Sequence, residues 1–301
     1  MVYLLIVSLI WAWSFGIIKG NLAGIDSNFV AFGRLFLSML IFAPMIRLRG
    51  VPRKDIARLV LIGTLQYGVM YLTYIYSFQF LKAYEVALFT ILTPLYVTLV
   101  NNILKKRFFW VNLATTILAI IGAAIVETVQ LSDTSLLTGF LIVQISNFCF
   151  AFGQIYYKEV MERLPHIKDE HIFSLLYLGA VAITAVFTLL LADLSSLRLN
   201  QTQLLSLVYL GIVASGIGFF LWNYGARRVN PGALAIFNNL KIPLAIAVSL
   251  IFFRGSTSLP ELMIGGGIIV IALVINEWVN KRQLISTNSG ESLSFPQKNA
   301  Q

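Results

Sequence analysis

Hydrophobic positions in this chain gather in ten blocks, separated by short polar segments. Charged residues, glycines and prolines mark the limits of these blocks. A helix needs about 20 apolar residues to cross a hydrocarbon core of about 30 Å. The pattern therefore predicts ten transmembrane helices, at about residues 2–20, 27–47, 56–79, 83–104, 109–127, 137–157, 171–192, 203–225, 232–253 and 260–280.

The composition agrees with a membrane protein. Of the 301 residues, 58% are hydrophobic and 12% are charged, whereas soluble domains average roughly 45–50% apolar and about 25% charged residues. The first block starts almost at Met1 and lacks a basic leader and a clear cleavage site, so we expect a retained helix rather than a signal peptide. Cys149 is the only cysteine, which excludes a disulfide within one chain. We therefore expect one all-α integral membrane protein.

The basic residues indicate how the helices are oriented. Fifteen of the 22 lysines and arginines fall in segments that would share one side of the membrane. The opposite segments hold only Lys19, Lys82, Arg198 and Arg254. Because cytoplasmic loops carry an excess of positive charge, both termini are predicted to be cytoplasmic. The net charge of +9 therefore reflects orientation rather than a nucleic-acid-binding face.

The two halves of the chain resemble each other. Residues 11–19 align with 150–158, and residues 61–76 run parallel to 209–224. The matches stay in register across most of each half. The predicted organisation is a first five-helix repeat, a second five-helix repeat and a disordered cytoplasmic tail, at residues 1–127, 137–280 and 286–301.

A repeat of five helices crosses the membrane an odd number of times, so its second copy must enter from the opposite side. Inverted repeats of this kind recur in secondary transporters, where the two halves enclose a central site that opens alternately to either side. The pattern therefore predicts two inverted repeats and favours a transporter.

The same residues resemble a known family, the ten-helix EamA-type permeases of the drug/metabolite transporter superfamily. The resemblance covers about residues 4–280 and is carried by Trp11-Ala12-Trp13-Ser14, Phe32-Gly33-Arg34-Leu35, Thr93-Pro94-Leu95 and Ile242-Pro243-Leu244. It implies a central cavity lined by helices one to four and six to nine, and export of amino acids or related metabolites. Lys241 and the pair Asn238-Asn239 depart from the commoner family pattern, which argues against a purely hydrophobic cargo.

Lys241 is a candidate for binding a substrate carboxylate. It lies about ten residues into the ninth block, close to the expected bilayer midplane, where a lysine costs roughly 2.5–3.5 kcal/mol on insertion scales. Asn238 lies one turn earlier on the same face. The alternative is a structural lysine bonded to backbone carbonyls or to a buried acid.

Arg34 is the second charged candidate. It lies about seven residues into the second block, and its guanidinium is suited to gripping a carboxylate through two hydrogen bonds. The alternatives are a helix-packing role and a side chain that extends to the membrane interface.

Aromatic and polar side chains extend the candidate site. Tyr67, Tyr71 and Tyr74 follow at spacings of four and three, which places them on one helix face. Such a wall suits an amphiphilic metabolite, although a packing seam has the same spacing. Further candidates, for which interhelical hydrogen bonding is the alternative, are Trp11, Ser14, Asn147, Gln154 and Trp222.

Two prolines occupy corresponding depths in the fourth and ninth blocks. Pro94 and Pro243 are the expected hinges for alternating access, and static kinks are the alternative.

The sequence favours transport over catalysis. His166 and His171 lie in or beside the segment between the sixth and seventh blocks, and no zinc, Ser/His or phosphate-loop motif is present. We therefore predict no enzyme activity, no catalytic residue, no cofactor and no metal. The predicted function is export of amino acids or related carboxylated metabolites across the inner membrane, by a monomeric secondary transporter that contacts lipid and binds no nucleic acid. The alternatives are uptake, a drug or amine permease of the same fold, and a membrane receptor or channel.

Overall fold

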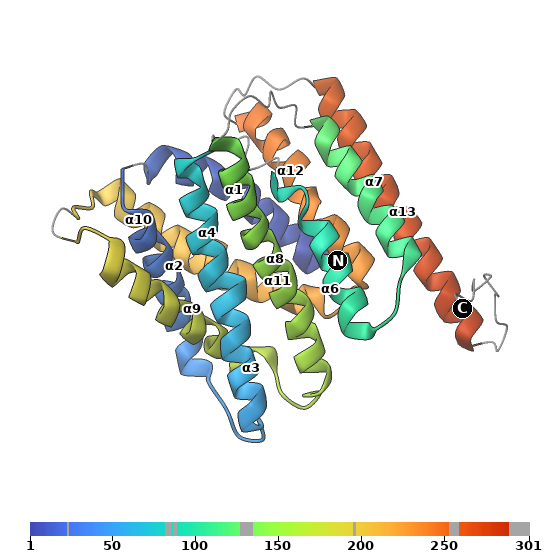
Figure 1. Ribbon diagram of the computed structural model, residues 1–301, viewed down its shortest axis with the longest axis horizontal. Helices are drawn as coiled ribbons and strands as arrows, with labels where there is room; N and C mark the ends of the chain where they lie inside the picture. Colours follow the sequence, from blue (N-terminus) through green and yellow to red (C-terminus); the bar gives the residue numbers. More distant parts are fainter. Residues whose placement is uncertain are drawn as a thin grey trace.

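The computed structural model describes residues 1–22, 24–81, 86, 89–126, 135–194, 197–252 and 259–288. Within these ranges every regular element is helical and no strand occurs. The helices pack into a bundle through which the chain runs back and forth (Figure 1). The α-helices are α1 Val2–Asn21, α2 Ser27–Phe42, α3 Arg53–Gly63, α4 Met70–Tyr76, α6 Thr93–Lys105, α7 Trp110–Val126, α8 Ser135–Glu162, α9 Asp169–Leu191, α10 Gln201–Tyr209, α11 Gly218–Ala226, α12 Pro231–Phe252 and α13 Leu259–Asn288.

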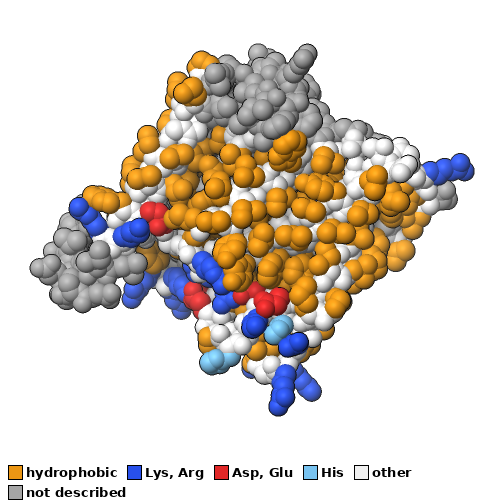
Figure 2. Space-filling view, turned by 180° about the vertical axis from the view of Figure 1, so that it is seen from behind, with side chains coloured by type: hydrophobic (Ala, Val, Ile, Leu, Met, Phe, Trp, Pro, Cys, Tyr) orange, Lys and Arg blue, Asp and Glu red, His pale blue; other side chains and the backbone are white. Residues whose placement is uncertain are grey.

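Several helices are suited to a lipid environment. Figure 2 shows hydrophobic side chains spread over one broad face, with a cluster of charged side chains at its lower edge. Leu190 is 75% exposed although it is large and apolar, as expected of a lipid-facing residue. Two shorter apolar helices, Val2–Ser14 and Trp110–Gly122, lie where the first and fifth spans were predicted. Six stretches are long and apolar enough to cross a membrane: Ser27–Met45, Arg53–Tyr76, Leu136–Glu162, Asp169–Leu191, Gln201–Ala226 and Met263–Arg282.

These features confirm an all-helical membrane protein. The count of ten spans, the inverted repeats and the cytoplasmic termini stay predictions. At the carboxyl end, α13 extends through residues 286–288, which were expected to be disordered, and residues 289–301 of that expected tail lie outside the described ranges.

Two of the long helical stretches contain a π-helical segment. The segment η2, Thr64–Val69, joins α3 to α4, and η4, Leu210–Ile217, joins α10 to α11. A π turn disturbs the regular backbone pattern and leaves carbonyls in need of other donors. Carbonyls of η4 accept hydrogen bonds from Trp11 at 2.9 Å, Ser38 at 2.8 Å and Tyr177 at 2.8 Å. Side chains of three other helices therefore hold this segment in place.

The helix contacts join the two halves of the chain. The helix α2 packs against α9 and η4, α9 packs against α3 and η2, and α8 packs against α4 and α6. The helix α1 lies against α11 and α12. At one edge of the bundle α7 and α13 lie side by side (Figure 1), and α12 packs against both of them. The centre of the molecule is therefore built from α1, α2, α4, α6, α8 and α11 together.

The two expected hinge prolines have different surroundings. Pro94 lies in the first turn of α6, where proline costs the helix no hydrogen bond. Pro243 lies inside α12, where its ring removes one backbone donor. Their role as paired hinges stays a prediction.

A buried ion pair ties α8, α9 and α11 together. The Asp169 carboxylate, only 4% exposed, accepts a hydrogen bond from the Tyr157 hydroxyl at 2.6 Å and forms an ion pair with Arg227. A buried carboxylate needs such partners because it has lost its contacts with water.

Asp169→Asn is expected to destabilise the protein by about 2 kcal/mol, because the change leaves the Arg227 guanidinium without its counter-charge. The melting temperature of the purified protein in detergent measures the effect. Asp55→Asn is the matched control, since its partner Arg58 is more exposed and the pair spans only three residues of one helix. Equal melting temperatures for the two variants would contradict this account of the ion pair.

Candidate functional site

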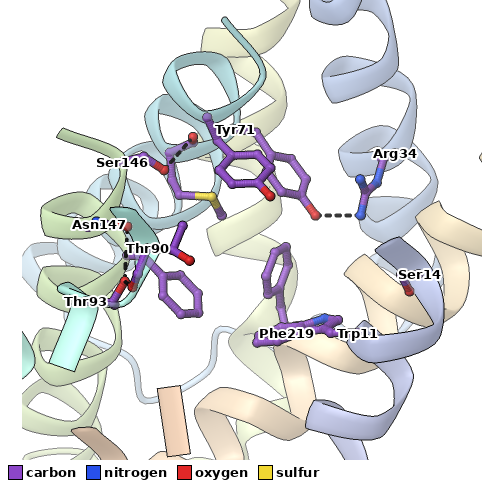
Figure 3. A pocket seen from close by; sticks show the side chains of 12 residues that line it. Trp11, Ser14, Arg34, Tyr71, Thr90, Thr93, Ser146, Asn147 and Phe219 are labelled. Carbon is purple, nitrogen blue, oxygen red and sulfur yellow. Dashed lines mark hydrogen bonds between the residues drawn. The ribbon is translucent and has the colours of Figure 1, made fainter. Parts of the chain in front are cut away.

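A cavity of about 110 Å³ lies at the centre of the bundle (Figure 3). Its walls come from α1, α2, α4, α6, α8 and α11, so both halves of the chain contribute. Aromatic rings, hydroxyl groups, one amide and one guanidinium surround it. The lining residues are Trp11, Ser14, Arg34, Met70, Tyr71, Tyr74, Thr90, Thr93, Ser146, Asn147, Phe150 and Phe219.

Arg34 is the charged residue among the described residues of this lining. Its side chain is 5% exposed, and its guanidinium donates from Nε to Ser215 Oγ at 3.2 Å and from Nη2 to the Tyr71 hydroxyl at 2.7 Å (Figure 3). The Tyr71 hydroxyl in turn lies 3.1 Å from Ser215 Oγ. These two neutral partners fix the orientation of the guanidinium.

The charge of Arg34 has no counter-charge among the described residues. None of the ion pairs that they form includes Arg34. A buried cation is stable when an opposite charge lies close to it. The cavity beside Arg34 is therefore suited to an anionic group, above all a carboxylate.

The opposite wall carries amide and hydroxyl groups. Asn147 Nδ2 donates to the Phe89 carbonyl at 2.8 Å, which orients the amide. Thr93 Oγ1 lies 3.0 Å from Asn147 Oδ1 and 2.7 Å from the Thr90 carbonyl. Figure 3 shows Arg34 and these residues on opposite sides of the cavity. A ligand between them meets a cation at one end and neutral polar groups at the other.

Aromatic rings close one side of the cavity. The ring of Trp11 lies 5.6 Å from that of Phe219, 6.0 Å from that of Phe150 and 4.9 Å from that of Trp222, between centroids. Trp222 is fully buried, does not line the cavity, and also lies 6.1 Å from the ring of Phe150 between centroids. We call these four residues the aromatic floor. They offer a large apolar surface to the hydrocarbon part of a ligand.

The structure brings six of the predicted site residues to this cavity and places four others elsewhere. Trp11, Ser14, Arg34, Tyr71, Tyr74 and Asn147 belong to the lining. Tyr67, Gln154, Trp222 and Asn238 are buried outside it, with exposed fractions of 0%. Lys241 lies in α12, but its side chain is outside the described residues, so its role stays a prediction.

Other lining residues were not predicted as site residues. Met70 and Ser146 were not singled out in the sequence, because apolar or small residues inside a hydrophobic block have no distinguishing pattern. Phe150 was noted only as the counterpart of Trp11 in the internal repeat. Thr90, Thr93 and Phe219 also line the cavity. Thr90 and Thr93 were noted only because they precede Pro94. Phe219 was noted because it matches Tyr71 in the internal repeat and shares a helix face with Trp222.

The chemistry of the cavity suits binding. The described residues of its lining include no carboxylate, imidazole or thiol. Within the described ranges, no group of three or more His, Cys, Asp or Glu side chains is placed to hold a metal ion. What the lining offers is a fixed positive charge, placed hydrogen-bond partners and apolar contact.

Comparisons with known proteins agree with this architecture. The model of the EamA-like transporter family matches residues 1–128 and 137–278. The biotin transporter of Salmonella typhimurium is 38% identical over 285 residues, which cover 94% of this chain and 95% of that protein. The probable biotin transporter of Pseudomonas aeruginosa is 38% identical over 283 residues, covering 93% and 97%.

Two further similarities are weaker in sequence. A probable amino-acid metabolite efflux pump of Salmonella typhimurium is 26% identical over 190 residues, covering 58% of this chain and 60% of that protein. A solved crystal structure superimposes with a TM-score of 0.77 at 16% identity, covering 93% of this chain and 98% of that one, which shows the fold alone. Export of amino acids is therefore not confirmed.

The family match covers nearly all of the chain, and the biotin transporters are related to it over almost their whole length. The protein is a transporter rather than an enzyme, and a multi-pass protein of the bacterial inner membrane that moves a small molecule. The chain belongs to the EamA-like transporter family.

Proposed function

We propose that this protein takes up a small carboxylate of the biotin type by alternating access. Biotin carries a carboxylate at the end of an aliphatic chain and a cyclic urea at the other end. The observation that carries the proposal is the buried Arg34 guanidinium, which borders the cavity without a carboxylate partner among the described residues. The relatives named biotin transporters support this choice of substrate.

The geometry at Arg34 favours recognition of a carboxylate. Tyr71 and Ser215 occupy the Nη2 and Nε donors, and among the described residues no other hydrogen-bond partner of the guanidinium is found, so Nη1 and the remaining proton on Nη2 can meet a ligand. A charge-assisted hydrogen bond in a buried site is roughly twice as strong as a neutral one. Arg34 is therefore the proposed anchor for the carboxylate.

The remaining lining matches the rest of such a molecule. The aliphatic chain would lie against the rings of Trp11, Phe150 and Phe219, which form the exposed part of the aromatic floor. The urea would meet the hydroxyl and amide groups of Thr93 and Asn147.

We further propose that residues 1–127 and 137–280 are two inverted five-helix repeats. Several contacts occur in matching pairs: α1 packs against α11 and α12, as α8 packs against α4 and α6. Similarly, α2 packs against η4 and α9 packs against η2. The two π-helical segments occupy corresponding places in the halves, and the family model matches each half. Such pairing supports a mechanism in which the halves exchange conformations around a central site.

The proposed orientation places the cavity toward the outer side. With a cytoplasmic amino terminus, Ser14 lies in the outer half of α1 and Arg34 in the outer half of α2. The ion pair of Asp169 with Arg227 then lies at the cytoplasmic end. In this orientation the cavity lies on the side from which an uptake transporter receives its substrate.

Uptake of labelled biotin into cells that depend on this protein tests the proposal. We expect saturable accumulation of labelled biotin. Unlabelled biotin should inhibit this accumulation at a concentration at least about tenfold lower than biotin methyl ester, since the ester lacks the charge that Arg34 binds. Amino acids in excess are expected to have no effect. Absence of accumulation, together with faster loss of a preloaded amino acid from these cells, would favour export instead.

A further inference from the structure

Residues of α8 line two different cavities. Phe150 lines the cavity beside Arg34, whereas Lys158 and Glu162 line a second cavity of about 530 Å³ near the end of α8. Gln154 lies four residues after Phe150 and four residues before Lys158, so the three side chains follow one another on the same helix face. Gln154 therefore lies between the two cavities.

The second cavity has the features of a polar vestibule. Lys105 reaches across it to Glu159 at 2.6 Å and to Glu162 at 3.2 Å. The hydrogen bond to Glu159 raises the pKa of Lys105 above its ordinary value. Gln154 lies on the stretch of α8 between the residues that line the first cavity and those that line this vestibule.

Gln154 forms a buried cluster with two other side chains. Its Oε1 accepts hydrogen bonds from Trp222 Nε1 at 2.8 Å and from Asn238 Nδ2 at 3.3 Å. Asn238 Nδ2 also donates to the Leu234 carbonyl at 2.8 Å. All three side chains are 0% exposed. Because an indole only donates and a carbonyl only accepts, these bonds fix which end of each amide is oxygen and which is nitrogen.

This assignment leaves one donor and one acceptor unused. Gln154 Nε2 and Asn238 Oδ1 have no hydrogen-bond partner within the described part of the chain. An unpaired buried polar group is unfavourable, and more so where lipid surrounds the bundle. The pair presents a free N–H group and a free carbonyl oxygen on neighbouring side chains.

We propose that Gln154 and Asn238 form an inner binding station for a group that presents a carbonyl beside an N–H, as a cyclic urea or an amide does. The Gln154 N–H would donate to the ligand carbonyl, and Asn238 Oδ1 would accept from the ligand N–H. The aromatic floor separates this station from the outer cavity, so a substrate reaches it when Trp11 and Trp222 move apart. The inference rests on the proposed function and extends it to a second site on the path.

Another buried amide pair shows what a purely structural contact looks like in this protein. Gln66 Nε2 donates to Asn223 Oδ1 at 2.8 Å, and Asn223 Nδ2 donates back to Gln66 Oε1 at 3.1 Å. Both side chains are 0% exposed and satisfy each other. Gln66 is therefore a matched control for Gln154.

The test compares biotin with 2-iminobiotin, in which the ring carbonyl is replaced by an imino group that donates instead of accepting. Both compounds compete for uptake of labelled biotin into proteoliposomes containing the wild-type protein, Gln154→Met, Gln154→Glu or Gln66→Met. We expect the wild-type protein to prefer biotin by about tenfold or more. Gln154→Met should lose most of this preference. Gln154→Glu should reverse the preference, because its carboxylate still accepts a hydrogen bond from Trp222 but presents a second acceptor in place of the N–H donor of Gln154. Gln66→Met should keep the wild-type ratio even if its melting temperature falls.

The outcomes separate the two proposals. An unchanged preference in either Gln154 variant, with folded protein shown by its melting curve, would overturn the inner station and leave the proposed function intact. Absence of biotin uptake by the wild-type protein would overturn both.

Discussion

Replacing Arg34 by glutamine is expected to lower biotin uptake by about two orders of magnitude, because truncating one partner of a buried, hydrogen-bonded charge pair costs about 2–5 kcal/mol. Arg34→Lys should recover part of the loss. A lysine keeps the charge, but it has no planar fork with which to bond Ser215, Tyr71 and a carboxylate together. Initial uptake rates over a range of biotin concentrations measure the effect.

Two controls accompany the Arg34 variants. Arg228→Gln removes an arginine that bonds to the Tyr224 carbonyl on an exposed part of the structure, and should leave uptake unchanged. Biotin methyl ester lacks the carboxylate, so Arg34→Gln should weaken its transport far less. A folded Arg34→Gln protein with wild-type biotin uptake would remove Arg34 from the site.

Gly63→Ala is expected to prevent accumulation of folded protein or to lower its melting temperature strongly. The helices α3 and α9 approach so closely that a Cβ atom at Gly63 would overlap the Leu176 carbonyl, and one at Gly179 would overlap the Val60 carbonyl. Small residues allow such close approach between membrane helices. Because backbone rather than a flexible side chain must move, we expect a cost at or above about 3 kcal/mol, the upper end of typical overpacking effects.

Gly267→Ala provides the matched control in α13. Nothing lies within 4 Å of a Cβ at Gly267, and alanine favours a helix over glycine by roughly 0.5–1 kcal/mol. This variant should therefore melt at or slightly above the wild-type temperature. A Gly63→Ala protein that is as stable as Gly267→Ala would contradict the close approach of α3 and α9.

The overall class of the fold could be predicted from hydrophobic block length, because a helix must be about 20 residues long to cross lipid. The same reasoning identified Arg34 and Asn147, since a charge or an amide within an apolar block requires a partner or a polar cavity. Both line the central cavity. Their roles in binding are proposals that the Arg34 and uptake experiments address.

Other features depend on three-dimensional packing and have no sequence signal of their own. The π segment η4 is held by donors from Trp11, Ser38 and Tyr177, which lie in three other helices. The spacing of Tyr67 and Tyr71 suggested one shared wall, but Tyr67 lies within η2 and stacks on Phe219 at 4.3 Å outside the cavity lining. A change of helix type alters which side chains share a face, and periodicity cannot detect it.

The substrate also could not be predicted from the sequence pattern. An arginine within a membrane helix indicates an anionic partner, but it does not distinguish an amino acid from another carboxylate. The relationship to biotin transporters and the apolar lining beside Arg34 favour a carboxylate with a hydrophobic body.

The central claim is that this protein itself moves biotin. Uptake of labelled biotin into proteoliposomes that contain only the purified protein tests it most directly, with protein-free liposomes as the background. We expect saturable uptake that unlabelled biotin abolishes and an excess of amino acids leaves unchanged. Folded protein that gives no uptake above background would contradict the claim.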